Sequence, residues 1–495
     1  MAIDARINID VDRSIGKRDR LIFGQFIEHF HRQIYGGLLD PGSPFSDERG
    51  FRMDVIDAIK HLKPSVMRWP GGCFASAYHW KDGIEPYRQA TWDKSWRIED
   101  PNTFGTDEFI AWCREIDTEP YICVNAGSGT WEEMSDWVEY CNLKNEGKWS
   151  KQRIANGHPE PYNVRYWSVG NENYIEYTEV GARKPNDWAE FAAEGAKMMK
   201  RVDLDIKIIV PSWLYSSWAE PMLKRMAYLM DFIAIHGYGA HQESPYMEVV
   251  AGGKYTEQQI SKMENILGSF DHLGKIDIAI DEWNPHGWQI SFDTPLEVDR
   301  KEQEKNEINA TYTMGDAISQ SCFFNNCFRH CQTVKMANFS SIVNTRGVIY
   351  THPEGIVLRS TYHVFDLYVN HTYEEVLDAY CASPKIIYNY NGKDEEISYV
   401  DASVTIDRDA KKIAIAVSNA HPDEAATFKC WIPGVSLGEK GVMQTVNGDS
   451  IFSFNGIDNP NDIKITRSEI NASGERCEMT LQPHSVNVIT LGFEQ

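Results

Sequence analysis

Two glutamates in this chain each follow an apolar segment, a setting that suits acid–base or covalent chemistry. Glu172 ends the run Trp-Ser-Val-Gly-Asn-Glu, and Glu282 ends the run Ile-Ala-Ile-Asp-Glu. If both runs are strands of one parallel sheet, their carboxyl ends lie at the same edge and the two side chains can face each other. Glycoside hydrolysis uses such a pair, because one carboxyl protonates the leaving oxygen while the other attacks or activates water.

The elements that would position these glutamates repeat along most of the chain. Between about residues 20 and 372, short apolar runs alternate with amphipathic stretches, including 51–62, 107–116, 133–141, 188–199 and 361–369. This alternation is typical of repeated βα units. The expected strands are residues 21–28, 66–69, 121–125, 164–170, 207–211, 232–236, 276–281 and 334–342. Eight such units predict an α/β fold, a (β/α)8 TIM barrel, with its active site at the carboxyl ends of the strands.

A second domain is expected after the barrel, over residues 373–495. Helical periodicity gives way there to short alternating runs, such as 413–417, 427–431 and 486–491, separated by Asn, Gly, Asp and Pro. This pattern predicts a C-terminal antiparallel β-sandwich. Residues 5–11 also alternate between apolar and polar. We therefore expect residues 1–19 to add a strand to the sandwich.

Polar side chains gather where the expected barrel strands end. The clusters are Glu28-His29, Arg68 with Gly71-Gly72-Cys73, Asn171-Glu172-Asn173, His236 with Tyr238, and Asp281-Glu282-Trp283-Asn284. Any one cluster could be a hydrogen-bonded structural feature. Burying several carboxylates at one rim, however, costs free energy, so such a cluster is more easily explained by a role in catalysis than by a role in stability. The sequence therefore predicts an active site there.

Composition narrows the class of protein and its partners. The formal net charge is -23, with 72 acidic against 49 basic residues, which disfavours nucleic acids and anionic membranes as partners. The N-terminal residues lack the apolar run of a signal peptide, and no run of about 18 apolar residues appears, so we expect a cytoplasmic protein without a membrane span. The ten cysteines are scattered, and Cys322, Cys327 and Cys331 lack a CxxC pattern, so we expect no metal site.

The motifs around the two glutamates resemble a known family. Gly170-Asn171-Glu172 and Asp281-Glu282-Trp283 are similar to the hallmarks of glycoside hydrolase family 51, the α-L-arabinofuranosidases. Further matches lie at residues 26–29, 69–72, 78–83, 125–129 and 361–365 and cover nearly the whole barrel. The resemblance implies that Glu172 is the general acid/base and Glu282 the nucleophile of a retaining double displacement. It also implies that no cofactor is needed.

The resemblance also implies further roles at the site. The side chains expected to contact the sugar are Glu28, Cys73, Asn171, His236, Tyr238, Trp283 and Ser341, and Arg68 would act through Glu282 or Asp281. Two of the positions expected to contact the sugar depart from the family pattern. Cys73 stands where many relatives carry Asn, and Ser341 stands where Gln is usual. The shorter Ser hydroxyl cannot reach a ligand at the same distance, which leaves the identity of the sugar open.

The expected activity is exo-acting release of terminal α-L-arabinofuranosyl groups from arabinan or arabinoxylan oligosaccharides. The family resemblance also implies a homo-oligomer, a trimer or a hexamer. One alternative keeps the mechanism with another sugar or cleavage mode, as in a galactofuranosidase, a xylosidase or an endo-β-glucanase or xylanase. Another is a non-catalytic carbohydrate-binding protein, which would not need both glutamates.

Overall fold

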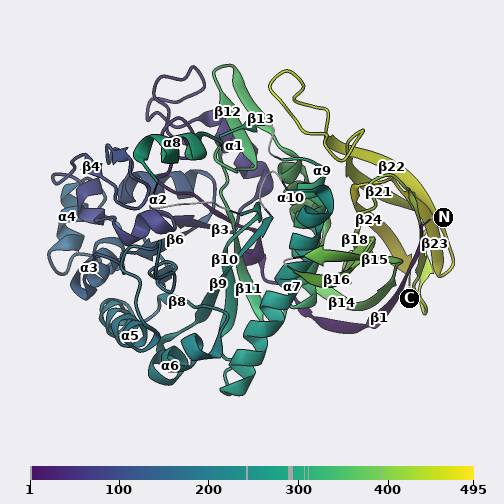
Figure 1. Ribbon diagram of the computed structural model, residues 1–495, viewed down its shortest axis with the longest axis horizontal. Coiled ribbons are helices and arrows are strands. Elements are labelled where there is room, and N and C mark those ends of the chain that lie inside the picture. The colour runs from purple at the N-terminus through teal and green to yellow at the C-terminus, as the bar shows by residue number, and fades with distance from the viewer. Residues whose placement is uncertain are drawn as a thin grey trace.

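A closed barrel of eight parallel strands forms the larger part of the molecule (Figure 1). The computed structural model describes residues 3–240, 244–287, 294–305, 307–309, 312–390 and 392–494. The barrel strands are β2 (Gly24–Phe26), β3 (Val66–Trp69), β6 (Glu119–Val124), β7 (Tyr166–Val169), β8 (Lys207–Pro211), β9 (Phe232–Ala240), β10 (Asp277–His286) and β11 (Val334–Ser340). They follow one another around the barrel in chain order, and β11 pairs with β2 to close it. The predicted barrel is confirmed.

Helices surround the barrel in Figure 1. They are α1 (Met53–Leu62), α2 (Thr106–Glu115), α3 (Trp131–Asn142), α4 (Trp149–Ala155), α5 (Pro185–Val202), α6 (Ser216–Met226), α7 (Tyr246–Ser269), α8 (Leu296–Lys305), α9 (Met314–Arg329) and α10 (Ser360–His371). Helix α5 shows why these segments are helical: Pro185 occupies its first turn, and Trp188, Ala192, Ala196 and Met199 are buried along one face. Pro fits that position because the N–H it lacks would have no helical partner.

The first barrel strand is shorter than the predicted segment 21–28. Arg20–Phe23 form a 3-10 turn, because the Asp19 side chain accepts a hydrogen bond from the N–H of Leu21 and caps it. Strand β2 then spans Gly24–Phe26. Glu28 consequently lies just beyond the strand, at the carboxyl end of the barrel.

The C-terminal part of the chain forms the predicted antiparallel sheet domain, beside the barrel in Figure 1. Its strands are β1 (Ile3–Lys17), β14 (Glu375–Ala382), β17 (Val400–Asp407), β18 (Lys412–Asn419), β19 (Ala426–Trp431), β20 (Ser436–Leu437), β21 (Lys440–Asn447), β22 (Lys464–Ser473), β23 (Arg476–Leu481) and β24 (Ser485–Glu494). They belong to one curved sheet that turns back on itself, since β18 pairs with both β17 and β24. The N-terminal strand β1 lies between β14 and β19.

The sheet domain has a hydrophobic core of its own. Alternate residues of its strands point inward and are buried, as in Ile3, Ala5 and Ile7 of β1. The sheet meets the barrel at α9, where Arg329 lies 3.0 Å from Asp401 of β17. On this arrangement we propose residues 20–372 and 373–495 as the two domains, with residues 1–19 joined to the second.

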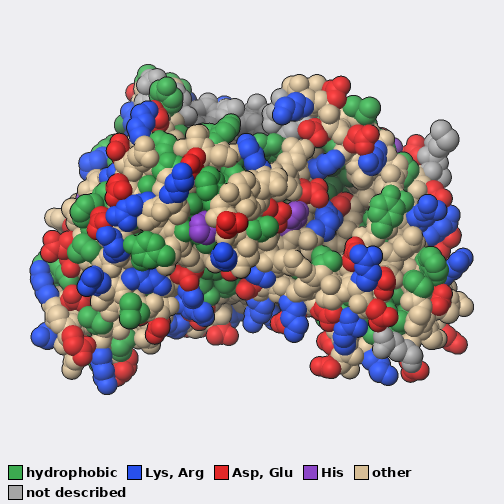
Figure 2. All heavy atoms as spheres, turned by 90° about the horizontal axis from the view of Figure 1, so that it is seen from below, with side chains coloured by type: hydrophobic (Ala, Val, Ile, Leu, Met, Phe, Trp, Pro, Cys, Tyr) green, Lys and Arg blue, Asp and Glu red, His purple; other side chains and the backbone are tan. Residues whose placement is uncertain are grey.

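The surface mixes charges of both signs. Lys and Arg side chains are interspersed with Asp and Glu across the face in Figure 2. All ten cysteines are free thiols. Within the described residues, none of the helices has the length and apolar character needed to cross a bilayer.

Candidate active site

The two glutamates singled out in the sequence lie together at the carboxyl end of the barrel. Glu172 follows β7, and Glu282 belongs to β10. A carboxylate oxygen of each and a ring nitrogen of His236 all lie within 4.8 Å of one another. The backbone of Glu172 has φ of 42°, a left-handed conformation that is uncommon for residues other than glycine and that is often found at functional sites. The turn after Gly170 therefore fixes where the Glu172 side chain points.

A bulge in β10 explains why two successive acids can face the barrel interior. The pairing with β9 shifts between Ala279, which pairs with Ala234, and Glu282, which pairs with His236. One extra residue on β10 is thereby accommodated, and such bulges re-aim side chains. As a result both Asp281 and Glu282 contact His236, at 3.2 and 3.4 Å.

Arg68 connects the acidic residues of the site and is fully buried. Its Nη1 donates to Glu282 Oε1 at 2.5 Å, and its Nη2 donates to Asn171 Oδ1 at 2.9 Å. Its Nε lies 3.3 Å from Asp281 Oδ2. Burial opposes ionisation of Asp281, but Arg68 and His236 lower the pKa of that carboxyl overall. The guanidinium thus holds Glu282 and Asn171 in fixed relative positions.

His236 and Tyr238, both on β9, bind the two glutamates from the other side. His236 Nδ1 lies 2.7 Å from Glu172 Oε1, and the Tyr238 hydroxyl donates to Glu282 Oε2 at 2.7 Å. Burial alone would lower the pKa of His236, but the charges of Glu282 and Glu172 raise that pKa well above its usual range. The neighbouring carboxylates therefore favour the protonated form of the imidazole, whose positive charge offsets the negative charge of the site.

Glu28 lies beside the paired glycines that follow β3. Its Oε1 accepts hydrogen bonds from the N–H groups of Gly72 and Phe74, each at 3.0 Å, and from Trp96 Nε1 at 2.9 Å. Burial and the charge of Glu282 raise the pKa of Glu28 to about 8. A Cβ on Gly71 would lie 2.3 Å from Glu28 Cγ. These glycines therefore let the backbone pass directly against the acidic site.

A fourth glutamate, which the sequence did not single out, completes the group. Glu179 lies on the loop between β7 and α5 and is 6% exposed. It accepts a hydrogen bond from the Ser76 hydroxyl, and the side chains of Cys73 and Asn171 lie nearby. A Glu179 oxygen, the Cys73 sulfur and a Glu172 oxygen lie within 4.8 Å of one another. Burial and the charge of Glu172 raise the pKa of Glu179 to about 8.

Glu179 should make the stability of the protein depend on pH. Its pKa rises from 4.5 unfolded to about 8 folded, so the folded state keeps a proton that the unfolded state loses. Stability attributable to Glu179 is therefore full below about pH 4.5 and declines as pH rises toward about 8. In Glu179→Gln this decline should shrink by a few kcal/mol. Thermal unfolding at a series of pH values from about 5 to 9 measures this pH dependence of stability. Glu354→Gln is the matched control, because Glu354 is exposed. Equal slopes in variant and parent would contradict the assignment.

Two predicted sugar contacts lie elsewhere. Trp283 follows Glu282 on β10 and points to the opposite side of the strand, where its ring stacks on Phe323 of α9 at 3.5 Å between centroids. Trp283 is thus a core residue. Ser341 is fully buried, and its hydroxyl donates to the backbone carbonyls of Val343 and Thr345 at 3.2 and 2.9 Å. The structure therefore buries both side chains and does not bring either into the group around Glu172 and Glu282.

The structure brings the other eight predicted residues together. They are Glu28, Arg68, Cys73, Asn171, Glu172, His236, Tyr238 and Glu282. The oxygens of Glu172 and Glu282 approach within 4.8 Å. That separation suits a retaining glycosidase, whose carboxyl groups lie about 5 to 5.5 Å apart, better than an inverting one, which needs about 6.5 Å or more to admit a water. The carboxylate oxygens, the His236 ring nitrogen and the Cys73 sulfur could also ligate a divalent cation. A bound cation would occupy the two carboxyl groups that glycoside hydrolysis needs.

Comparisons with known proteins agree with this geometry. Residues 58–250 match the family model "Alpha-L-arabinofuranosidase 1 domain", and residues 281–485 match "Alpha-L-arabinofuranosidase C-terminal domain". Alpha-L-arabinofuranosidase C of Emericella nidulans is 33% identical over 90% of each chain. The intracellular exo-alpha-(1->5)-L-arabinofuranosidase of Halalkalibacterium halodurans is 29% identical over 87% of each. The crystal structure of the Thermotoga maritima alpha-L-arabinofuranosidase in complex with arabinose superimposes with a TM-score of 0.89 at 34% identity, covering 99% of this chain and 100% of that one.

The matches extend across both domains, and the solved relatives include a family 51 enzyme from Thermotoga petrophila at 35% identity and a TM-score of 0.89. The sequence matches, the fold and the paired carboxyl groups therefore all indicate the same family. This chain belongs to glycoside hydrolase family 51, the α-L-arabinofuranosidases.

Proposed function

We propose that the chain releases terminal α-L-arabinofuranosyl groups by a retaining double displacement, with Glu282 as nucleophile and Glu172 as acid and base. The observation that carries the proposal is the approach of their carboxylate oxygens within 4.8 Å. The family establishes the reaction class, and the contacts of each side chain support the roles proposed for it.

In the first step a Glu282 oxygen attacks the anomeric carbon while Glu172 protonates the departing glycosidic oxygen, so the alcohol leaves and a glycosyl ester forms. Both Glu282 oxygens accept hydrogen bonds, from Arg68 and Tyr238. These contacts hold the carboxylate in one orientation before the sugar arrives, which lowers the cost of reaching the transition state.

In the second step Glu172 takes a proton from water, whose oxygen attacks the anomeric carbon and breaks the ester to Glu282. Two inversions give net retention. Arg68 fixes Asn171 through Oδ1, which leaves its Nδ2 to donate to the hydroxyl next to the anomeric carbon. That contact strengthens as the sugar gains positive charge. Glu28, Cys73 and Tyr238 line the same space and supply partners for the other hydroxyls.

The substrates we propose are short arabinan or arabinoxylan oligosaccharides, cleaved from the non-reducing end inside the cell. The name of the Halalkalibacterium relative, an intracellular exo-acting enzyme, supports the cleavage mode and the location. A homo-oligomer, a trimer or a hexamer, follows from resemblance to the family.

A panel of nitrophenyl glycosides tests the choice of sugar. We expect hydrolysis of the α-L-arabinofuranoside with kcat/KM at least about tenfold above the galactofuranoside, xyloside and glucoside, since an ill-fitting sugar group typically costs 1 to 3 kcal/mol. Activity on a neutral arabino-oligosaccharide should release arabinose from one end. Hydrolysis of the other glycosides without the arabinofuranoside would refute the assigned sugar.

Gly72→Ala should impair catalysis without unfolding the barrel. A Cβ at this position would lie 2.6 Å from Glu282 Oε1, so the nucleophile must shift. Misplacement of a reacting group by about 1 Å can cost roughly 100-fold in rate, and we expect a fall in kcat of that order. Gly268→Ala in α7 is the matched control, because an added Cβ there meets nothing within 4 Å. Equal kcat in the two variants would show that Glu282 tolerates displacement.

A further inference from the structure

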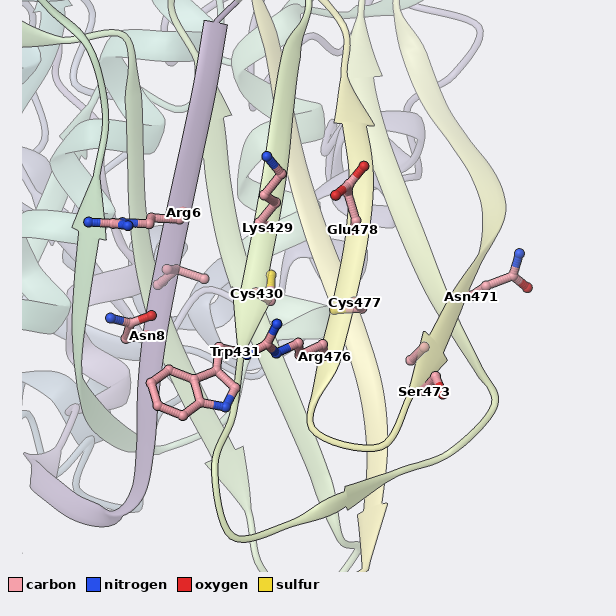
Figure 3. Close-up of a pocket in the computed structure, with 12 residues that line it drawn as sticks. Arg6, Asn8, Lys429, Cys430, Trp431, Asn471, Ser473, Arg476, Cys477 and Glu478 are labelled. Atoms are coloured by element: carbon pink, nitrogen blue, oxygen red, sulfur yellow. The ribbon is translucent and has the colours of Figure 1, made fainter.

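The sheet domain carries a hollow on its outer face, away from the barrel. The hollow has a volume of about 590 Å³. Strands β1, β19, β22 and β23 line it, and Figure 3 shows the polar side chains of these strands projecting from the sheet. The proposed catalytic mechanism uses none of them.

Side chains from four adjacent strands form a row across this face. Tyr380 of β14 pairs with Asn8 of β1, Asn8 pairs with Trp431 of β19, and Trp431 pairs with Arg476 of β23. Directly paired residues point to the same face of a sheet. Tyr380 is 69% exposed and Trp431 is 41% exposed. Because one strand separates them, their Cα positions lie about 10 Å apart, a spacing comparable to the length of a disaccharide.

The Trp431 ring is held in place by its neighbours. Its Nε1 donates to Glu475 Oε2 at 3.2 Å, and the Arg476 guanidinium carbon lies 6.0 Å from the ring centroid. Figure 3 shows Arg476 reaching toward the indole. An aromatic ring fixed in this way can stack on the apolar face of a sugar at little cost in conformational entropy. The amide of Asn8, between the two aromatic residues, can both donate to and accept from sugar hydroxyls.

Basic side chains reach the hollow from strands β1, β19 and β23. Three basic side chains, Arg6, Lys429 and Arg476, and one acidic side chain, Glu478, line it, while the acids Glu475 and Asp4 contact the lining residues Trp431 and Lys429. Lys429 is paired with Asp4 at 2.9 Å. Arg476 and Arg6 then offer guanidinium groups, which bind carboxylates with two parallel hydrogen bonds. These two guanidinium groups are therefore the contacts that a carboxylate ligand would use.

We propose that this row is a second carbohydrate-binding site, which takes a short linear oligosaccharide bearing uronic acid carboxylates. Trp431 and Tyr380 stack on its sugar rings, Asn8 bonds the hydroxyls between them, and Arg476 binds a carboxylate. The site would tether acidic, arabinose-substituted saccharides to the enzyme. The inference is independent of the roles assigned to Glu172 and Glu282.

Titration calorimetry of the full-length protein with trigalacturonate tests the proposal, since this probe has no arabinofuranosyl group for the catalytic site. We expect one bound trimer per chain, with affinity that falls as salt rises. Trp431→Ala, Tyr380→Ala and Arg476→Ala should each weaken binding roughly tenfold, a loss of about 1.4 kcal/mol. Galactotriose, the matched neutral trimer, should bind at least about tenfold more weakly. Tyr228→Ala, which removes another exposed ring at 72% exposure, should change nothing.

Three results would overturn the inference. These are absence of binding to the parent protein, equal affinity in the Trp431, Tyr380 and Tyr228 variants, or equal affinity for the neutral trimer. Sedimentation of the same variants tests the remaining alternative, in which a second copy of this chain packs on the row. If Trp431→Ala converts an oligomer to monomers, the row is an interface between copies of this chain. Hydrolysis of the nitrophenyl arabinofuranoside should persist in all these variants, so failure here is separable from failure of the proposed reaction.

Discussion

Glu282→Ala should lower kcat on an aryl α-L-arabinofuranoside by about 10⁴-fold or more, because removal of a catalytic nucleophile removes the covalent route itself. Arg68 and His236 lose one anionic partner but keep Asp281, at 3.3 and 3.2 Å. We therefore expect the variant to stay folded with lower stability, since unpairing buried charges is destabilising. Circular dichroism and thermal unfolding, measured beside the rates, separate loss of chemistry from loss of fold.

A small anion distinguishes the nucleophile from a structural carboxylate. The alanine leaves space beside the anomeric carbon, so azide should restore part of the rate with an activated aryl glycoside and give the inverted arabinofuranosyl azide. Glu282→Gln, which keeps the shape of the side chain, should be equally inactive and should not be rescued. Near-normal hydrolysis by Glu282→Ala would eliminate this residue as the nucleophile.

Glu172→Ala should produce a loss that depends on the leaving group. A sugar alcohol needs a proton in order to depart, so hydrolysis of arabino-oligosaccharides should fall by about 10² to 10⁴-fold, the usual contribution of a general acid. A dinitrophenolate needs no proton, so its release in the first step should be almost unchanged, and the slow second step should then limit turnover. A pre-steady-state burst of dinitrophenolate would report this change.

The anomeric configuration of the azide product again distinguishes the acid/base from the nucleophile. Because Glu282 still forms the ester in Glu172→Ala, azide attacks that ester and the product should have the α configuration of the substrate. His236→Asn serves as a comparison, since it removes the ring that lies 2.7 Å from Glu172 Oε1 but keeps the carboxyl. Equal loss for good and poor leaving groups in Glu172→Ala would contradict the role of Glu172 as acid.

The barrel and the pairing of the glutamates were predictable because they depend on local patterns. Apolar runs separated by helical periodicity predict strands and helices, and the barrel topology then places the residues at strand ends on one rim. Glu28, Arg68, Asn171 and His236 follow by that argument. The curvature of the second sheet was not predictable, because pairing of β18 with both β17 and β24 depends on contacts between distant segments.

The differences between the predicted site and the observed one have local physical causes. Side chains alternate along a strand, but the bulge before Glu282 changes which residues face inward, and periodicity alone gives no sign of it. Trp283 therefore lies in the core. Ser341 turns its hydroxyl to the carbonyls of its own loop. Glu179 was missed because it comes from a loop, where no strand pattern indicates the direction of a side chain.

The central claim is that Glu282 forms a covalent bond to the sugar, and mass spectrometry of a trapped intermediate tests it most directly. Glu172→Ala mixed with dinitrophenyl α-L-arabinofuranoside should accumulate the glycosyl ester, because its second step lacks a base. After digestion, one arabinosyl group should be found on the peptide that contains Glu282, and on Glu282 itself after fragmentation. An arabinosyl group on Glu28 or Glu179, or a burst of dinitrophenolate without any adduct, would contradict the account.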